Sequence, residues 1–84
     1  MVTITVKYFA GLREALGASS EEMKFTEAPT VSEVVDQVFG AHPEQAAYRP
    51  SLMLAVNMAY AQADTMLTDG DELALIPPVS GGSR

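Results

Sequence analysis

Residues 30–40, with the sequence TVSEVVDQVFG, predict the main helix and decide the fold. Thr30 and Glu33 form a capping-box pattern, in which each side chain accepts a hydrogen bond from the backbone amide of the other residue. The apolar residues that follow recur at helical spacing and give the helix one face to bury. These residues are Val31, Val34, Val35, Val38 and Phe39. Gly40 and Pro43 are expected to end the helix.

Two segments before the main helix alternate between apolar and polar residues, which predicts strands. Residues 1–9 read MVTITVKYF, and residues 21–26 read EEMKFT. A change of period between them predicts a short helix over residues 10–16, which Gly17 closes. The second strand can therefore return antiparallel to the first.

Three short strands are predicted after the main helix, over residues 52–56, 59–62 and 72–76. A turn at residues 57–58 joins the first two, and Gly70 supplies the positive φ of the turn before the third. This order of elements predicts an α+β fold. We expect a mixed sheet of about five strands packed on one main helix, plus a short helix.

Length and composition limit the class of protein. A chain of 84 residues forms one domain, and its lack of cysteine excludes disulfides and a thiolate nucleophile. A small fold without disulfides fits a reducing cytosol. No apolar run is long enough to span a membrane, and Met1 leads into a strand pattern rather than a signal peptide. We therefore expect a cytoplasmic protein.

The charge of the chain bears on its partners. Eleven acidic residues against five basic ones give a net charge of −6, and the basic residues form no cluster. Nucleic acids and anionic membranes are therefore poor partners. A basic protein partner would suit this charge, although such a charge is also common where it serves solubility alone.

The usual signatures of an active site are missing from the sequence. His42 has no second histidine or cysteine at ligand spacing, and Asp69 and Asp71 lack the remainder of a calcium loop. Turn chemistry explains the two aspartates better. There is no nucleophile elbow and no phosphate-binding loop. We expect no metal, no bound cofactor and no independent enzymatic activity.

The end of the chain carries the strongest functional signal. Residues 77–84 read PPVSGGSR, which suits neither a helix nor the interior of a sheet. We expect a folded domain over residues 1–76 and a flexible arm over residues 77–84. Gly81 and Gly82 have no side chains, so they could pass through a narrow slot in a partner. The alternative is an ordinary frayed terminus.

Three segments together resemble the small, sulfur-carrying subunit of molybdopterin synthase, a ubiquitin-like β-grasp family. They are LAVN at residues 54–57, LTDGDE at residues 67–72 and PPVSGG at residues 77–82. Weaker agreement comes from VKYFA at residues 6–10 and LRE at residues 12–14. Each segment alone is a weak signal, but their relative spacing is specific and covers most of the chain.

The resemblance implies a chemistry that partner enzymes perform on Gly82. In the family, a ubiquitin-activating-like enzyme uses ATP to adenylate the terminal glycine. A sulfur donor then converts it to a thiocarboxylate, which gives its sulfur to molybdopterin in the large synthase subunit. Gly82 would carry the sulfur. The resemblance implies that Gly81, Ser80 and Val79 thread the tail into the partner.

The chain departs from the family pattern after Gly82, because Ser83 and Arg84 follow it. Gly82 can be adenylated only once these two residues are lost. Three origins of Ser83 and Arg84 stay open: native residues that a protease trims, a cloning remnant, or the stub of a longer fusion. A related carrier for thiamine or cysteine synthesis, and a non-covalent ubiquitin-like interaction module, are the alternative functions.

A carrier also needs a surface by which its enzymes hold it. If Leu73 faces the main helix, Ala74 and Ile76 face outward beside the arm. Met53 and Ala55 on the neighbouring strand would extend that face. We expect these four residues to bind the partner. The alternative is that they are ordinary half-buried sheet positions.

Overall fold

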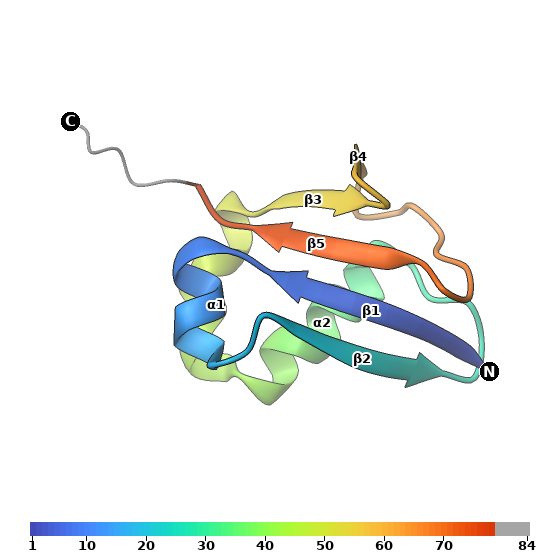
Figure 1. The fold of residues 1–84 in the computed structure, drawn as a ribbon, viewed down its shortest axis with the longest axis horizontal. Helices are drawn as coiled ribbons and strands as arrows, with labels where there is room; N and C mark the ends of the chain where they lie inside the picture. Colours follow the sequence, from blue (N-terminus) through green and yellow to red (C-terminus); the bar gives the residue numbers. More distant parts are fainter. Residues whose placement is uncertain (79–84) are drawn as a thin grey trace.

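A five-stranded mixed sheet with helix α2 packed behind it forms the body of the protein (Figure 1). The structure is a computed structural model and describes residues 1–78. Its elements in chain order are β1 (Val2–Tyr8), α1 (Ala10–Leu16), β2 (Ser20–Phe25), α2 (Val31–Ala41), the 3₁₀ helix η1 (Pro43–Ser51), β3 (Met53–Val56), β4 (Ala59–Tyr60) and β5 (Glu72–Ile76). The predicted α+β architecture is confirmed.

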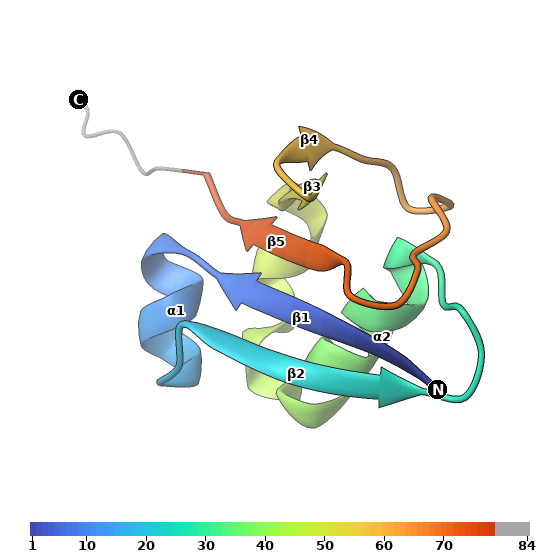
Figure 2. The ribbon, with the colours of Figure 1, turned by 45° about the vertical axis from the view of Figure 1, so that its right-hand side comes forward.

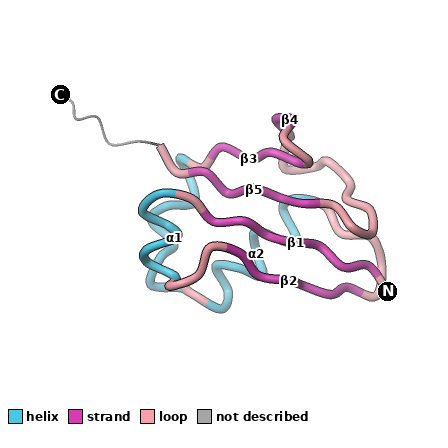
Figure 3. Tube along the Cα trace, viewed as in Figure 1, coloured by secondary structure: helices cyan, strands magenta, loops and turns pink. Residues whose placement is uncertain are grey.

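The strands lie in the order β2-β1-β5-β3-β4. Strands β1 and β5 run parallel, and every other neighbouring pair is antiparallel, as the arrows of Figure 1 show. Figure 3 shows the five strands side by side in the same order. Since parallel strands finish at the same edge of a sheet, β5 ends beside the end of β1. This edge also carries α1 (Figure 2).

The capping box at the start of α2 forms as predicted. The Thr30 amide donates to Glu33 Oε1 at 2.8 Å, and the Glu33 amide donates to Thr30 Oγ1 at 3.2 Å. The expectation that Gly40 ends the helix is wrong, because α2 continues to Ala41. The helix stops before Pro43, which has no amide hydrogen and instead begins η1.

The core lies between α2 and the inner face of the sheet. Its fully buried members are Ile4, Val6, Leu12, Val31, Val34, Val38, Leu67, Leu73 and Leu75. Tyr8 joins them with its ring buried, and its hydroxyl donates to Glu21 Oε1 at 2.7 Å. Burial, followed by this hydrogen bond, raises the pKa of Tyr8 well above its usual range. Because Ile4, Val6 and Tyr8 are all buried, the alternation predicted for residues 1–9 is confirmed.

Strand β4 is shorter than predicted. It ends at Tyr60, because the next residues form a turn in which the Gln62 amide donates to Thr65 Oγ1 and the Thr65 amide donates to the Gln62 carbonyl. Within residues 1–78, none of the helices combines the length and apolar character needed to cross a membrane.

Candidate functional site

The root of the predicted arm lies where β1 and β5 both end (Figure 1). Tyr8 pairs with Leu75 in the parallel register, so Phe9 and Ile76 follow at the same edge of the sheet. Pro77 is buried and Pro78 is exposed. The chain therefore leaves the body of the domain at this edge.

The tail residues predicted to act in sulfur transfer lie outside the described residues. They are Val79, Ser80, Gly81 and Gly82, together with Ser83 and Arg84. Their predicted roles, and the predicted boundary between domain and arm, stay predictions.

The four residues predicted to bind a partner lie on the face of the sheet opposite α2, which we call the open face. Ile76 pairs with Met53 across the two strands, and Ala74 pairs with Ala55. Because neighbouring residues of a strand point to opposite faces, the buried Leu75 puts Ala74 and Ile76 on the open face. The predicted orientation of these residues is confirmed.

Exposure differs among the residues of the open face. Met53 is 44% exposed, whereas Ala55 is only 6% exposed. Ala55 lies between its cross-strand partners Tyr60 and Ala74, so it forms the floor of the surface rather than its rim. The side chains around Ala55 therefore supply most of the area that a partner could contact.

Three exposed apolar residues of the open face were absent from the predicted set. Phe9 is 39% exposed, Tyr60 is 77% exposed and Met58 is 94% exposed. Together with Ala74 and Ile76 they line a hollow of about 430 Å³. One signal for Phe9 was present in the sequence, because it lies one residue after the inward-facing Tyr8. The places of Met58 and Tyr60 on this face follow only from the pairing of β3 with β4 and β5, which the local sequence pattern does not predict.

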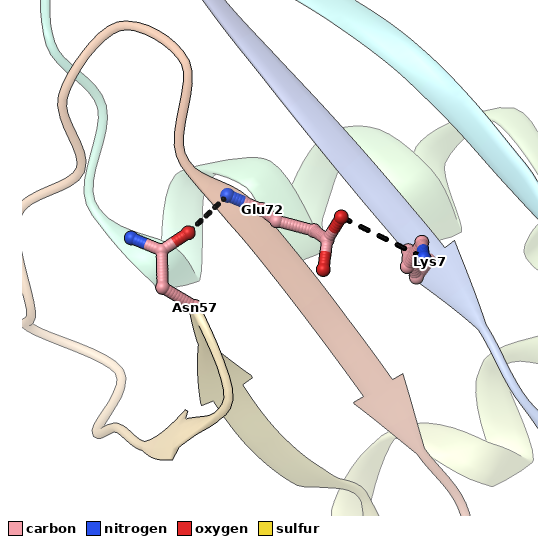
Figure 4. A network of polar contacts seen from close by, with 3 residues as sticks. All are labelled: Lys7, Asn57 and Glu72. Atoms are coloured by element: carbon pink, nitrogen blue, oxygen red, sulfur yellow. Dashed lines mark hydrogen bonds and ion pairs between the residues drawn. The ribbon is translucent and has the colours of Figure 1, made fainter.

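One ion pair borders the hollow. Lys7 Nζ lies 3.6 Å from Glu72 Oε2, and the two side chains are 43% and 41% exposed (Figure 4). An exposed pair at this separation adds little to stability. Its main effect is to leave one positive and one negative group beside an otherwise apolar surface.

A hydrogen-bonded latch joins the β3–β4 turn to the start of β5 (Figure 4). Asn57 Oδ1 accepts from the Glu72 amide at 3.0 Å, and Asn57 Nδ2 donates to Asp71 Oδ1 at 2.9 Å. Asp71 Oδ2 accepts from the Thr68 amide at 2.8 Å. The bond from the Thr68 amide, followed by the bond from Asn57, lowers the pKa of Asp71. The latch fixes the hairpin relative to the open face.

The two aspartates of the predicted turn have structural partners. Asp69 Oδ1 accepts from the Thr3 amide at 2.7 Å, and Asp71 belongs to the latch. The interpretation as residues bonded within their own turn is confirmed for Asp71, which accepts from the Thr68 amide, whereas the Asp69 side chain bonds to Thr3 on β1 instead. His42 lies near one carboxylate, Glu44, with Nδ1 and Oε2 4.0 Å apart. Among residues 1–78, no three acidic or histidine side chains gather in a way that could hold a metal ion.

Curated relatives match nearly the whole chain. The molybdopterin synthase sulfur carrier subunit of Mycobacterium tuberculosis is 36% identical over 83 residues, covering 98% of this chain and 100% of that protein. The Escherichia coli protein of the same name is 39% identical over 82 residues, covering 94% and 99% of the two chains.

Structural similarity agrees with the sequence matches. The crystal structure of small archaeal modifier protein 1 from Haloferax volcanii has a TM-score of 0.83 and 28% identity, covering 94% of this chain and all of that one. The profile of the ThiS family matches residues 6–82. By fold and by sequence, the chain therefore belongs to the ThiS family of ubiquitin-like β-grasp proteins, together with the molybdopterin synthase sulfur carrier subunits.

Proposed function

We propose that this chain is the sulfur-carrying small subunit of a molybdopterin synthase. The observation that carries the proposal is the extent of the family match, which runs from residue 6 to Gly82 and so includes the glycine pair. Relatives named for this role match 94% or more of the chain. The similarity therefore covers both the domain and the segment on which the chemistry would take place.

The proposed chemistry takes place at the carboxyl group of Gly82. A carboxylate is a poor electrophile, so an activating enzyme first uses ATP: a carboxylate oxygen attacks the α-phosphate, pyrophosphate leaves and an acyl-adenylate forms. A sulfur donor then supplies the sulfur that displaces AMP, and a thiocarboxylate results. ATP would be bound by the activating enzyme rather than by this chain. Gly82 would carry the sulfur, and Gly81, Ser80 and Val79 would thread the tail into the large subunit.

Gly82 must have a free carboxyl group for this chemistry. We propose that Ser83 and Arg84 are removed before Gly82 is activated, since the carboxyl group of Gly82 otherwise forms an amide with Ser83. An amide carbonyl cannot attack ATP as a carboxylate does. The chain with both residues in place would be a precursor.

The open face is the proposed docking surface for the large subunit and the activating enzyme. It combines exposed apolar side chains, Phe9, Met53, Met58 and Tyr60 among them, with a position next to the root of the arm. Contiguous exposed apolar area of this kind marks protein interfaces. A partner that covers this surface would receive the arm at the same edge. We propose that these encounters take place in the cytosol, because a small domain without cysteine is typical of a reducing compartment.

The first test is the intact mass of the untagged protein purified from its own host. The proposal expects chains that end at Gly82, some with one oxygen replaced by sulfur. Chains that end at Gly82 without sulfur would support a carrier that has been trimmed but not loaded. Retention of Arg84 in all molecules would contradict the carrier function and favour a non-covalent interaction module.

A second test uses the purified activating enzyme and ATP. The chain truncated after Gly82 should form an acyl-adenylate, while the chain with Ser83 and Arg84 should not. Gly82→Ala in the truncated chain should impair sulfur transfer, because the added methyl group would hinder entry of the tail into a narrow slot of the partner. Equal adenylation of the untruncated chain at Arg84 would exclude Gly82 as the activated residue.

The similarity to an archaeal modifier protein favours a second candidate function. A modifier would use the activated Gly82 to join itself to an amine of another protein. The intact-mass experiment separates the two, because a modifier yields covalent conjugates and a carrier yields the thiocarboxylate. A related carrier for thiamine or cysteine synthesis would give the same thiocarboxylate but would not support molybdopterin formation by the large subunit.

A further inference from the structure

The tip of the β3–β4 hairpin has an unusual backbone conformation. Asn57 has φ 49° and Met58 has φ 72°, so both central residues of the turn are left-handed. Turns of this type favour asparagine followed by glycine, because glycine has no Cβ to clash. Asparagine at the first position follows that preference. Methionine at the second position is strained.

The domain gains nothing from the Met58 side chain that would offset this strain. Met58 is 94% exposed, so its side chain adds almost nothing to the core. A large apolar residue that is both strained and exposed lowers stability, and no buried contact of its side chain offsets the loss. Backbone strain of this kind, held in place by its surroundings, is typical of functional positions.

The latch at Asn57 holds Met58 in this conformation. The Asn57 amide donates to the Glu72 carbonyl at 2.8 Å, and Asn57 Oδ1 accepts from the Glu72 amide at 3.0 Å (Figure 4). The bond from Asn57 Nδ2 to Asp71 adds a third tie. These bonds attach the hairpin tip to a central strand rather than to its own partner strand alone.

The strained conformation places Met58 beside the apolar residues of the open face. Its side chain lines the same hollow as Phe9, Tyr60 and Ile76, so it extends the apolar open face beyond the sheet. Methionine is unbranched and polarizable, and it adapts well to irregular apolar surfaces of partners. A mostly exposed residue at the rim of such a patch can be buried in full only by another protein.

We propose that Met58 is a docking side chain that enters an apolar recess of the large synthase subunit, and that Asn57 is the positioning residue that holds it there. This inference rests on the proposed function, which supplies the partner. It adds a specific contact that neither the strand pattern nor the glycine pair predicts.

The test measures thermal stability and affinity on the same variants, with the purified large subunit of the same organism as the probe. Met58→Gly relieves the strain and removes the contact. It should raise the thermal midpoint by about 4 °C and weaken the dissociation constant at least about fivefold. Met66→Ala is the matched control, since Met66 is 59% exposed and does not line the hollow. That variant should leave the affinity unchanged.

Asn57→Gly distinguishes positioning from general stability. Glycine keeps the left-handed turn but removes the side-chain bonds, so it should weaken binding several-fold when Met58 is present. In the Met58→Gly background the same change should have no further effect on affinity, because there is no side chain left to position. Equal effects in both backgrounds would overturn the positioning role.

The outcomes separate this inference from the function on which it rests. If the unaltered chain fails to bind the large subunit, the proposed function fails and the inference fails with it. If the unaltered chain binds and Met58→Gly binds equally well, only the inference is overturned. A fall in the thermal midpoint of Met58→Gly would likewise overturn it, since the strain on which it depends would be absent.

Discussion

The five residues of β5 point alternately to the two faces of the sheet, and the two faces serve different purposes. Leu73 and Leu75 are fully buried against the core, whereas Ala74 and Ile76 lie on the open face beside the root of the arm. The inner face stabilises the fold, and the outer face is available to a partner. In such a strand, stability and docking should respond to different substitutions even at adjacent positions.

Truncation on the inner face should have the largest effect on folding. Leu73→Ala removes buried atoms and leaves a cavity between the sheet and α2, so it should lower the free energy of unfolding by about 3 kcal/mol. Urea denaturation of the purified domain measures this change. A loss below about 1 kcal/mol would mean that the inner face of β5 is less tightly packed than its full burial indicates.

A charge on the outer face should affect binding instead. Ile76→Asp puts a carboxylate on the open face and should weaken affinity for the large subunit about tenfold or more. The thermal midpoint should change little, because Ile76 is only partly buried. Thr26→Asp, which adds the same charge at an exposed position after β2, is the control. A collapse of thermal stability without a specific loss of binding would assign Ile76 to the core.

The capping box tests whether the inner face can be weakened from a distance. Thr30→Ala removes the hydroxyl that accepts from the Glu33 amide, and it should lower the free energy of unfolding by about 1 kcal/mol. The apolar face of α2 would then be held less firmly against the sheet. Affinity for the large subunit should stay the same within error, since Thr30 lies away from the open face. Weaker binding would show that the two faces are coupled.

Local patterns in the sequence predict the inner face well. The alternation in residues 1–9, the capping box and the bounds of β5 depend on neighbours within a few residues, so period and cap are enough to predict them. The end of α2 departs from the prediction at Gly40, because a glycine can end a helix but is also tolerated inside one.

The open face is harder to predict because it depends on pairings distant in sequence. Lys7 lies beside Ala74 only through the parallel register of β1 and β5. The same pairing brings Phe9 near Ile76, and the β3–β4 hairpin brings Met58 to the same hollow. Four of its residues were predicted from the alternation of β3 and β5 alone. The contributions from Met58 and Tyr60 require the order of the strands, whereas the outward direction of Phe9 follows from its place after the inward-facing Tyr8.

The smallest predicted effect concerns Asp71, the latch residue that directly precedes β5. The bond from the Thr68 amide lowers the pKa of Asp71 in the fold, so ionised Asp71 stabilises the folded state. This contribution is complete above the ordinary aspartate pKa of about 3.9 and is lost as the pH falls through the lower folded pKa. It should stay below about 1 kcal/mol, because solvent screens an exposed carboxylate.

Asp71→Asn, compared with the unaltered domain by denaturation between neutral pH and strong acid, measures the contribution of the latch carboxylate. The difference in unfolding free energy should be largest at neutral pH and should shrink in acid, because Asp71 becomes protonated in both the folded and unfolded states. A difference that stays constant over this range would mean that hydrogen-bond geometry, and not the charge of Asp71, holds the latch. In that case acid should leave the position of Met58 unchanged, and the latch should hold Met58 through the bonds of Asn57 to Glu72.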